Sequence, residues 1–241
     1  MARIIRPNLV NTVRSSEISA FLHWGGFFAV LLIGSLILLV LRLYLPAALC
    51  VLVIAAAFPR ARKQVAVIRA GADGEAETLQ LLRRLPSGWT VIPDAVIVWK
   101  DHRSQTDYIV VAPTGVLILE AKNVSGKVSG RASDRELSQY KPSRGGRPAE
   151  RKQMYNPLHQ VKGHQTTLQN ILQGAGIRAR VLTAVYFSNP NAEVHISGGQ
   201  NVFTVRDSRS LDRSVQRLLE QNGEKVDCTA VIHAIRASFE K

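Results

Sequence analysis

The sequence predicts a mixed α/β domain with the element order α-β-β-β-α-β, preceded by an N-terminal transmembrane helical hairpin. Three observations support this prediction. An apolar stretch over residues 21–58 carries a single charged side chain. A helix-like segment is then followed by three strand-like segments, and a second helix-like segment is followed by another apolar strand. Such an order is typical of a mixed sheet flanked by helices.

Composition excludes several classes of protein. The chain has 241 residues, of which 46% are hydrophobic, so it is neither disordered nor collagen-like. Its two cysteines, Cys50 and Cys228, are too few for a disulfide scaffold or a Cys-rich zinc module. Lys and Arg number 31 against 18 Asp and Glu, which gives a formal net charge of +13. This excess favours a polyanionic partner, either nucleic acid or acidic lipid headgroups.

The apolar stretch predicts two short membrane spans. A helix crosses a bilayer with about 20 apolar residues, and segments 21–41 and 43–58 would turn near Arg42. Basic residues flank the stretch on both sides: Arg3, Arg6, Arg14, Arg60, Arg62 and Lys63. Because basic flanks stay in the cytoplasm, two crossings of the plasma (inner) membrane would keep both clusters there. The alternative is a buried helical hairpin of a soluble protein.

We therefore divide the chain into a basic cytoplasmic N-terminus, a membrane hairpin, a basic linker, an α/β domain and a C-terminal helical extension. These parts cover residues 1–20, 21–58, 59–70, 71–206 and 207–241. The α/β domain is expected to face the cytoplasm together with both basic flanks.

Each element of the α/β part has a local signal. Acidic residues open a helix over residues 72–85, and strands are predicted over residues 90–99, 107–112 and 116–122. A loop-rich region, residues 123–155, follows. Asn156 and Pro157 then suit the cap and first turn of a helix that ends near Gln173. The remaining predicted elements are strands over residues 180–187 and 201–205 and helices over residues 211–221 and 226–239.

Two carboxylates are predicted to meet where the second and third strands lie side by side. Alternation of side chains places Asp107 on the same face of its strand as Ile109 and Val111. It likewise places Glu120 and Lys122 on the face of the next strand that carries Ile118. A tight turn symmetric about residues 113–114 would pair positions whose numbers sum to 227. Asp107 would then face Glu120 with about 5 Å between their β-carbons. A bulged turn would shift this register by one residue.

Adjacent carboxylates favour a bound cation. Their repulsion raises the pKa of one of them unless a cation lies between them, and oxygen ligands suit magnesium or manganese. Glu75, at the start of the apolar stripe of the first helix, offers a third carboxylate. Two alternatives stay open: Glu75 merely stabilises the helix N-terminus, and Lys122 forms a plain salt bridge with Glu120.

These residues form a pattern that resembles a known family. The stretches GADGE (residues 71–75), QTDYIVV (105–111), GVLILEAKN (115–123) and NPLHQ (156–160) are similar to the nuclease-related domain, NERD, over about residues 71–187. That family is grouped with the restriction-endonuclease-like, PD-(D/E)xK superfamily, whose sites read as an aspartate followed by Glu-x-Lys. The resemblance implies that superfamily's α-β-β-β-α-β core and a metal-dependent nuclease site. Its residues would be Glu75, Asp107, Glu120, Lys122 and Gln160.

The predicted function is hydrolysis of phosphodiester bonds in DNA or RNA by a membrane-anchored, nuclease-like protein. Asp107, Glu120 and Glu75 would hold the metal, which polarises the phosphate. Lys122 would stabilise charge on the phosphate or orient water, and Gln160 would hydrogen-bond the phosphate or a metal water. Gln160 could equally be a surface or capping amide. The alternative function is a non-catalytic nucleic-acid-binding module tethered to the membrane.

Basic residues of the loop-rich region predict the nucleic-acid contact. Those assigned to phosphate binding are Lys127, Arg131, Arg144, Arg147, Arg151 and Lys152. The region follows Lys122 directly, so it would border the site. Two alternatives are a solvated insertion and a contact with anionic lipid. The histidines receive no role, because His159 and His164 are five residues apart on a helix and so not on one face.

Overall fold

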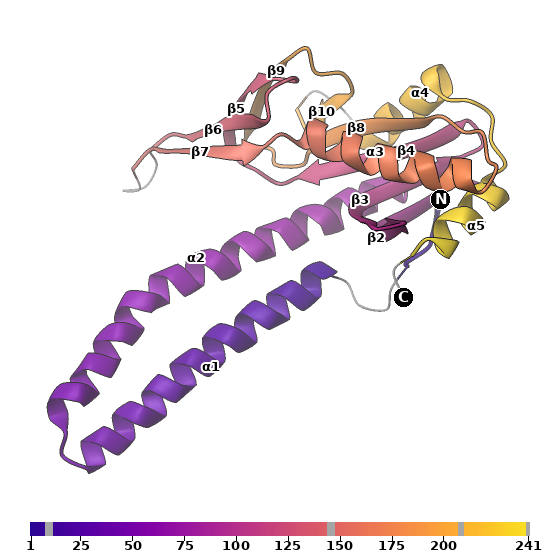
Figure 1. Cartoon of the computed structure of the whole chain (residues 1–241). Coiled ribbons are helices and arrows are strands. Elements are labelled where there is room, and N and C mark those ends of the chain that lie inside the picture. The colour runs from indigo at the N-terminus through magenta and orange to yellow at the C-terminus, as the bar shows by residue number, and fades with distance from the viewer. Residues whose placement is uncertain (8–11, 144–147, 207–209, 240–241) are drawn as a thin grey trace. The chain divides into compact units, whose positions relative to one another are not determined.

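A computed structural model describes residues 1–7, 12–143, 148–206 and 210–239 of the chain (Figure 1). The chain divides into two compact units. The helical unit comprises Val10–Asp73, and the α/β unit comprises Met1–Leu9 together with Gly74–Lys241. The predicted mixed α/β class is confirmed in the second unit, which holds a mixed sheet and the helices that cover it.

The helical unit contains two apolar helices joined by a tight turn. Helix α1 spans Thr12–Val40 and helix α2 begins at Tyr44, with Arg42 in a left-handed conformation (φ 59°) between them. The turn predicted near Arg42 is therefore confirmed. The Ser35 hydroxyl of α1 donates a hydrogen bond to the Ala47 carbonyl of α2 at 3.3 Å, which links the helices near the turn.

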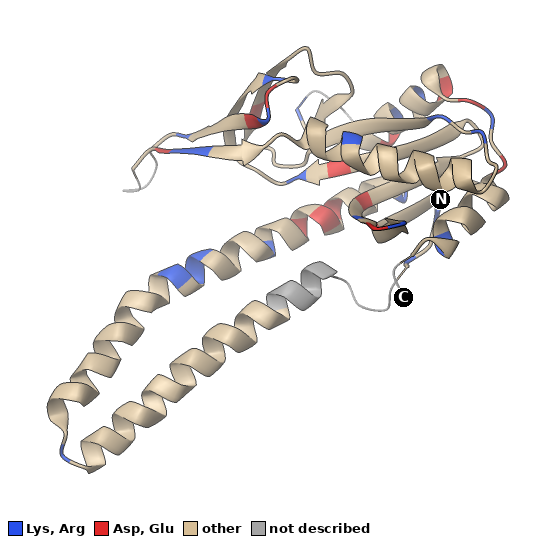
Figure 2. Cartoon of the chain, viewed as in Figure 1, with Lys and Arg blue, Asp and Glu red and all other residues tan. Residues whose placement is uncertain are grey.

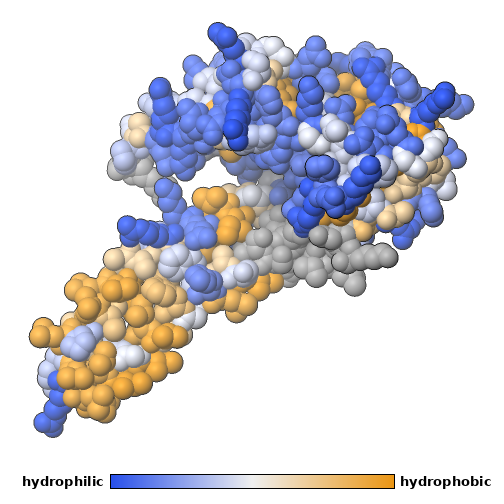
Figure 3. Space-filling model, viewed as in Figure 1, coloured by the Kyte–Doolittle hydropathy of each residue, from blue (hydrophilic) through white to orange (hydrophobic). Residues whose placement is uncertain are grey.

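Large apolar side chains cover much of the surface of this unit. Ile18–Val40 and Tyr44–Leu82 are both long and apolar enough to cross a membrane, judged by length and composition alone. Figure 3 shows a largely hydrophobic surface here, and Phe21, Leu36 and Leu45 are among the exposed side chains. An apolar surface of this extent marks contact with lipid or with another protein.

The predicted linker does not interrupt the second helix. Helix α2 runs from Tyr44 to Leu82 with Pro59 inside it. The expected linker, residues 59–70, and the expected helix, residues 72–85, are thus joined in one helix that carries first a basic and then an acidic cluster (Figure 2). Strong helix formers on both sides of Pro59, Ala and Arg among them, offset the loss of the backbone hydrogen bond that a proline cannot donate.

Six of the described strands form one mixed sheet in the order β1-β2-β3-β4-β8-β10. The three central antiparallel strands are β2 (Thr90–Trp99), β3 (His102–Ala112) and β4 (Gly115–Lys122). Strand β8 (Val181–Phe187) pairs in parallel with β4, and β10 (Val202–Thr204) pairs in parallel with β8. At the other edge, β1 (Arg3–Ile4) pairs in parallel with β2. Strand β3 begins at His102, earlier than the predicted start at Asp107.

Helices cover both faces of this sheet. Besides α2, the described helices of the α/β unit are α3 (Pro157–Gly174), α4 (Leu211–Asn222) and α5 (Cys228–Ala237). Leu168 of α3 and Ile235 of α5 share a buried core with Ile118. Leu82 of α2 shares the second core, to which α4 also contributes, with Leu117. Since neighbouring residues of β4 point to opposite faces, the two cores lie on opposite sides of the sheet.

A second sheet occupies the region predicted to be loop-rich. That prediction for residues 123–155 is wrong, because they contain β5 (Gly126–Arg131), β6 (Glu136–Lys141) and β7 (Glu150–Tyr155). With β9 (Ala192–Ser197) they form a four-stranded sheet in the order β7-β6-β5-β9 (Figure 1). Strand β9 pairs in parallel with β5 from a distant part of the chain, so local sequence signals could not reveal the partnership.

Asn156 joins this second sheet to the start of α3. Its side chain is fully buried, and its Oδ1 accepts a hydrogen bond from Leu158 N at 3.0 Å, which confirms the predicted cap. Its Nδ2 donates to the carbonyls of Arg131, Ala132 and Asp134 at 3.3, 3.2 and 2.7 Å. One side chain therefore caps the helix and satisfies the turn between β5 and β6.

We expect Asn156→Ala to lower the free energy of unfolding by about 2–4 kcal/mol, because the cap and the donors to buried carbonyls are lost together. Asn156→Asp keeps the cap acceptor but cannot donate, so it should not restore the loss. Denaturant unfolding of the full chain in detergent measures both. The control is Asn222→Ala, whose Nδ2 donates one hydrogen bond to Leu218 O at 3.3 Å, and its cost should stay near 1 kcal/mol or below. Equal costs for the two alanine variants would contradict the prediction.

Candidate active site

The candidate site lies where strands β3 and β4 stop pairing. The predicted register, with paired numbers that sum to 227, is confirmed as far as Tyr108 and Leu119. Gly115 permits the tight turn with a φ of 139°, a conformation that residues with side chains rarely adopt. Asp107 and Glu120 occupy the next positions along the two strands. The unbulged turn thus brings these two carboxyl groups to the same end of the hairpin.

Glu120 places a carboxylate at the buried end of β4, beneath α3. It is 0% exposed. Lys122 Nζ lies 2.6 Å from Glu120 Oε1 and 3.0 Å from Gln160 Oε1, so three of the predicted residues are in contact. Burial raises the pKa of Glu120, but His164 and the Lys122 ammonium together lower it by more than burial raises it. The net pKa of Glu120 therefore lies below its ordinary value. The carboxylate is therefore ionised at neutral pH.

Sequence reasoning missed His164, which completes the surroundings of this carboxylate. Its Nε2 lies 3.6 Å from Glu120 Oε2, which is too long for a hydrogen bond and forms an ion pair only when the imidazole is protonated. Its Nδ1 shares a hydrogen bond with Ser104 Oγ at 2.6 Å. The signal was present, because His164 follows Gln160 by four residues and so lies on the same face of α3.

Asp107 is the weaker acid of the pair. Its Oδ2 accepts a hydrogen bond from Ala121 N at 2.8 Å, so its side chain replaces a backbone partner where the strands part. Burial and the nearby charge of Glu120 raise the pKa of Asp107 to about 7. The two carboxyl groups thus titrate differently, with Glu120 ionised and Asp107 partly protonated near neutral pH.

Glu75 approaches the pair from α2. Burial and the charges of Asp107, Asp94 and Glu120 raise the pKa of Glu75 to about 8. The Tyr108 hydroxyl donates a hydrogen bond to the Glu75 carbonyl at 2.6 Å and so fixes this turn of α2 against β3. Sequence reasoning also missed Asp94, which adopts a φ of 49° within β2. A strained residue of this kind is typical of functional sites, and no pattern in the sequence revealed it.

The candidate site offers carboxylate oxygens, which are the ligand type that divalent cations such as magnesium prefer. Glu120 Oε2 is buried and has no hydrogen-bond partner among the described residues, so one carboxylate oxygen is available. In the described part of the chain, no three His, Cys, Asp or Glu side chains lie close enough together to hold a metal ion. Magnesium needs only one or two carboxylates when water and substrate phosphates complete its coordination. Ligation of a cation by Asp107, Glu120 and Glu75 stays a prediction.

The predicted phosphate-binding residues that the structure describes lie on the second sheet. They occupy strands β5 and β7: Lys127, Arg131, Arg151 and Lys152. Arg144 and Arg147 lie outside the described residues. These four described residues therefore belong to a folded sheet and not to the loop that the sequence predicts.

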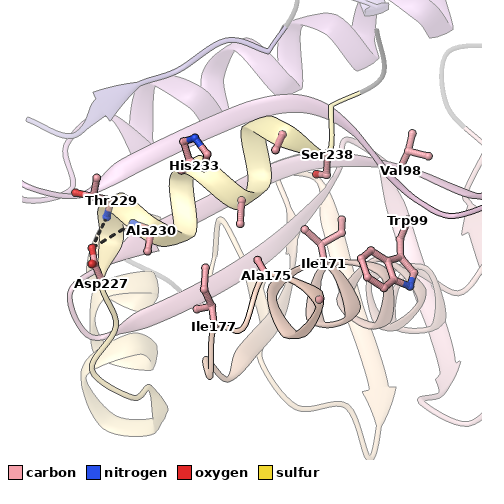
Figure 4. A pocket seen from close by; sticks show the side chains of 13 residues that line it. Val98, Trp99, Ile171, Ala175, Ile177, Asp227, Thr229, Ala230, His233 and Ser238 are labelled. Carbon is pink, nitrogen blue, oxygen red and sulfur yellow. Dashed lines mark hydrogen bonds between the residues drawn. The ribbon is translucent and has the colours of Figure 1, made fainter.

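An open groove lies elsewhere in the α/β unit, between α3 and α5. Its volume is about 770 Å³, and its lining includes Trp99, Ile171, Ile177 and His233 (Figure 4). Among the described residues, the lining includes none of those predicted for the active site. The groove is largely apolar and separate from the carboxylates, so we do not assign it to this site.

Comparison with protein families supports the resemblance seen in the sequence. Residues 70–188 match the family model NERD, nuclease-related domain. The matched segment contains all the predicted catalytic residues: Glu75, Asp107, Glu120, Lys122 and Gln160. The match suggests a nuclease-related function and an interaction with nucleic acid. No curated protein and no solved structure matches the chain.

The raised pKa values of two carboxyl groups predict how stability depends on pH. In the folded protein the pKa of Asp107 rises from 3.8 to about 7, and that of Glu75 from 4.5 to about 8. Between the ordinary pKa and the raised pKa of each group, the folded state holds a proton that the unfolded chain has released. The free energy of unfolding therefore falls as pH rises through this range. We expect the melting temperature in metal-free buffer to fall between about pH 5.5 and about pH 8.

Substitution isolates the contribution of one group. Asp107→Asn should flatten this pH dependence, because it removes one of the two titrating groups. Asp101→Asn, the same chemical change at an exposed turn, should follow the parent protein. A melting temperature that rises with pH in the parent would contradict the prediction.

Proposed function

We propose that this protein is a membrane-anchored, metal-dependent nuclease that hydrolyses phosphodiester bonds in DNA or RNA. The observation that carries the proposal is the meeting of Asp107 and Glu120 at the end of the β3–β4 hairpin, with Lys122 beside them. This arrangement lies within the segment that matches the nuclease-related domain. Clustered carboxylates next to an ammonium suit phosphate chemistry, because both a cation and a phosphate can be accommodated.

We infer that Asp107 and Glu120 hold magnesium or manganese, with Glu75 directly or through water. Two observations support this inference: the buried Oε2 of Glu120 has no hydrogen-bond partner among the described residues, and the two carboxyl groups repel each other. When bound, the cation would supply positive charge at the phosphate and lower the pKa of the attacking water. The raised pKa of Asp107 means that a proton competes for the same oxygens below about pH 7.

Lys122 would stabilise the negative charge that develops on the phosphate. Its ammonium contacts both Glu120 and Gln160, so its position is fixed before substrate binds. Gln160 would orient Lys122 and could exchange this contact for one with the phosphate. His164 is a positioning residue, because it contacts the second carboxylate oxygen of Glu120 and is itself oriented by Ser104.

We further propose the PD-(D/E)xK assignment, in which the α-β-β-β-α-β core of restriction-endonuclease-like proteins supplies the site. The chain order of α2, β2, β3, β4, α3 and β8 supports it, with β5, β6 and β7 inserted before α3. Asp107 and the Glu120-Ala121-Lys122 stretch occupy the positions of the aspartate and the Glu-x-Lys pattern. Basic residues of the inserted strands would bind the phosphates that flank the scissile bond.

We propose that the helical unit anchors the protein in the plasma membrane with the α/β unit in the cytoplasm. Two helices of sufficient length and apolar character support the anchor. Basic residues on both flanks support the cytoplasmic placement, because Lys and Arg near a span favour that side.

Two observations favour the alternative, a membrane-tethered module that binds nucleic acid without cleaving it. Among the described residues no three potential ligands are grouped for a metal, and Glu120 is already paired with Lys122. A binding module needs the basic surface but not the acidic pair. Cleavage assays on DNA and RNA with magnesium, manganese or EDTA decide between the two functions.

Asp107→Asn separates catalysis from folding. We expect it to abolish metal-dependent cleavage and to leave the melting temperature at about pH 8 unchanged or higher, because a buried charge beside Glu120 is removed. Nucleic-acid binding in EDTA should survive. Asp101→Asn serves as the matched control and should cleave as the parent does. Full activity of Asp107→Asn would remove Asp107 from the catalytic set.

Membrane anchoring is tested in cells that express the full chain. We expect the protein to stay in the membrane fraction after washes with high salt and alkaline carbonate, since apolar spans do not depend on charge. Protease added to intact cells should leave the α/β unit whole and should digest it after lysis. Release by salt would contradict anchoring, and digestion in intact cells would contradict the cytoplasmic placement.

A further inference from the structure

The second sheet has one buried and one solvent-exposed face. Paired residues of neighbouring strands share a face, and the buried residues of β5, β6 and β9 lie on one of the two faces. The buried side includes Val128, Leu137 and Ala192, which belong to the core under α3. We call the opposite side the outer face, and its members on β5, β6, β7 and β9 include Lys127, Arg131, Tyr140, Arg151, Tyr155 and His195.

Two tyrosines stand out on the outer face. Tyr140 of β6 is 41% exposed and Tyr155 of β7 is 51% exposed. Tyr155 lies opposite Glu136, four residues from Tyr140 along β6, so the two positions are separated by about 14 Å along the strands. An exposed aromatic ring on a sheet offers a flat surface on which an unpaired base can stack.

Basic side chains flank the Tyr140 position, whereas the cross-strand neighbour of Tyr155 is the acidic Glu136. The strand register places Lys127, Tyr140 and Arg151 in one row across β5, β6 and β7. Glu193, next to Lys127 in that row on β9, is paired with Arg206 at 3.6 Å, so its negative charge is balanced. An aromatic ring between two cations can hold a base on its face and the neighbouring phosphates on either side.

The outer face is also continuous with the candidate active site along the chain. Strand β5 begins at Gly126, shortly after Lys122, and β7 ends at Tyr155. Tyr155 directly precedes Asn156, the cap of the helix that carries Gln160. Both ends of the inserted strands are therefore tied to elements that hold catalytic candidates.

We propose that the outer face is a binding platform for single-stranded nucleic acid, with Tyr140 and Tyr155 stacking on unpaired bases and Lys127, Arg131 and Arg151 binding phosphates. This proposal rests on the proposed nuclease function and names its substrate class. In a duplex the base faces are stacked on one another, so the rings of such a platform cannot reach them. The tyrosines therefore favour single strands, whereas the basic side chains alone would bind both forms.

Binding is measured by fluorescence anisotropy with the full chain in phosphatidylcholine nanodiscs. The buffer contains EDTA, so that no cleavage occurs. The probes are labelled oligo-dT and oligo-U of about 20 nucleotides and a DNA duplex of equal length. The DNA and RNA arms show which single strand is preferred.

The double variant Tyr140→Ala, Tyr155→Ala should raise Kd for single strands by about tenfold or more, since stacking contributes about 1–3 kcal/mol per base. Its Kd for the duplex should change by less than about twofold, because phosphate contacts stay. Tyr140→Phe, Tyr155→Phe should bind as the parent does, because phenylalanine stacks without the hydroxyl. Melting temperatures confirm that all variants fold.

Salt dependence tests the basic part of the platform. Arg151→Ala should reduce the slope of log Kd against log salt by about one, as expected for one lost phosphate contact. Arg213→Ala, the same change on the exposed side of α4, should leave the slope unchanged. An equal effect of both variants would overturn the placement of the binding surface.

Several results would overturn the platform itself. These are unchanged single-strand binding by the alanine double variant, an equal loss for duplex and single strand, or a loss with phenylalanine as large as with alanine. A loss seen only for association with phosphatidylserine vesicles would identify a lipid surface instead.

Binding and cleavage assays distinguish the platform from the hydrolytic activity. If the tyrosine variants lose single-strand binding while the parent cleaves nothing with magnesium or manganese, the platform stands and hydrolysis fails. If the parent cleaves and the tyrosine variants bind single strands as the parent does, hydrolysis stands and the platform fails.

Discussion

The arrangement of the α/β unit depends on the burial of one charged group, the Glu120 carboxylate. It is fully buried at the end of an apolar strand, and an unpaired charge in that place would cost several kcal/mol. Lys122 of the same strand and His164 of α3 supply the compensating partners. Helix α3 must therefore lie over β4 in one particular rotation, the one that presents Gln160 and His164 to the strand. Asn156 fixes where that helix begins, so cap and ion pair act on the same geometry.

Much of the central sheet and the acidic pair could be predicted, because their signals are local. The turn at residues 113–114 fixes the β3–β4 register, and alternation then brings Asp107 and Glu120 to adjacent positions without knowledge of the rest of the fold. Asn156 followed by Pro157 marked the start of α3 for the same reason, since a cap and a first-turn proline act within a few residues. Such features depend on residues that are close together in the chain, so a local sequence pattern predicts them.

The features that could not be predicted depend on distant partners. Strands β5 and β9 pair across a long stretch of sequence, and their polar outer residues resemble those of a loop. Asp94 acquires its left-handed conformation from its place in the sheet, which no residue pattern marks. Helix α2 continues through Pro59 because its strong helix formers outweigh a local breaker. His164 could have been predicted from its spacing, because it follows Gln160 by four residues and so lies on the same face of α3.

The ion pair between Lys122 and Glu120 stabilises the fold but also occupies the carboxylate that the proposed cation would need. Lys122 neutralises Glu120, yet the proposed cation needs the same carboxylate. The geometry offers a way to satisfy both, because Lys122 Nζ already contacts Gln160 Oε1 as well as Glu120 Oε1, while Glu120 Oε2 has no hydrogen-bond partner in the described part of the chain. A cation could therefore approach Oε2 while Lys122 keeps its place between Oε1 and Gln160. The burial of Glu120 would then serve stability without a cation and chemistry with one, and Asp107, the weaker acid, would complete the pair once it loses its proton.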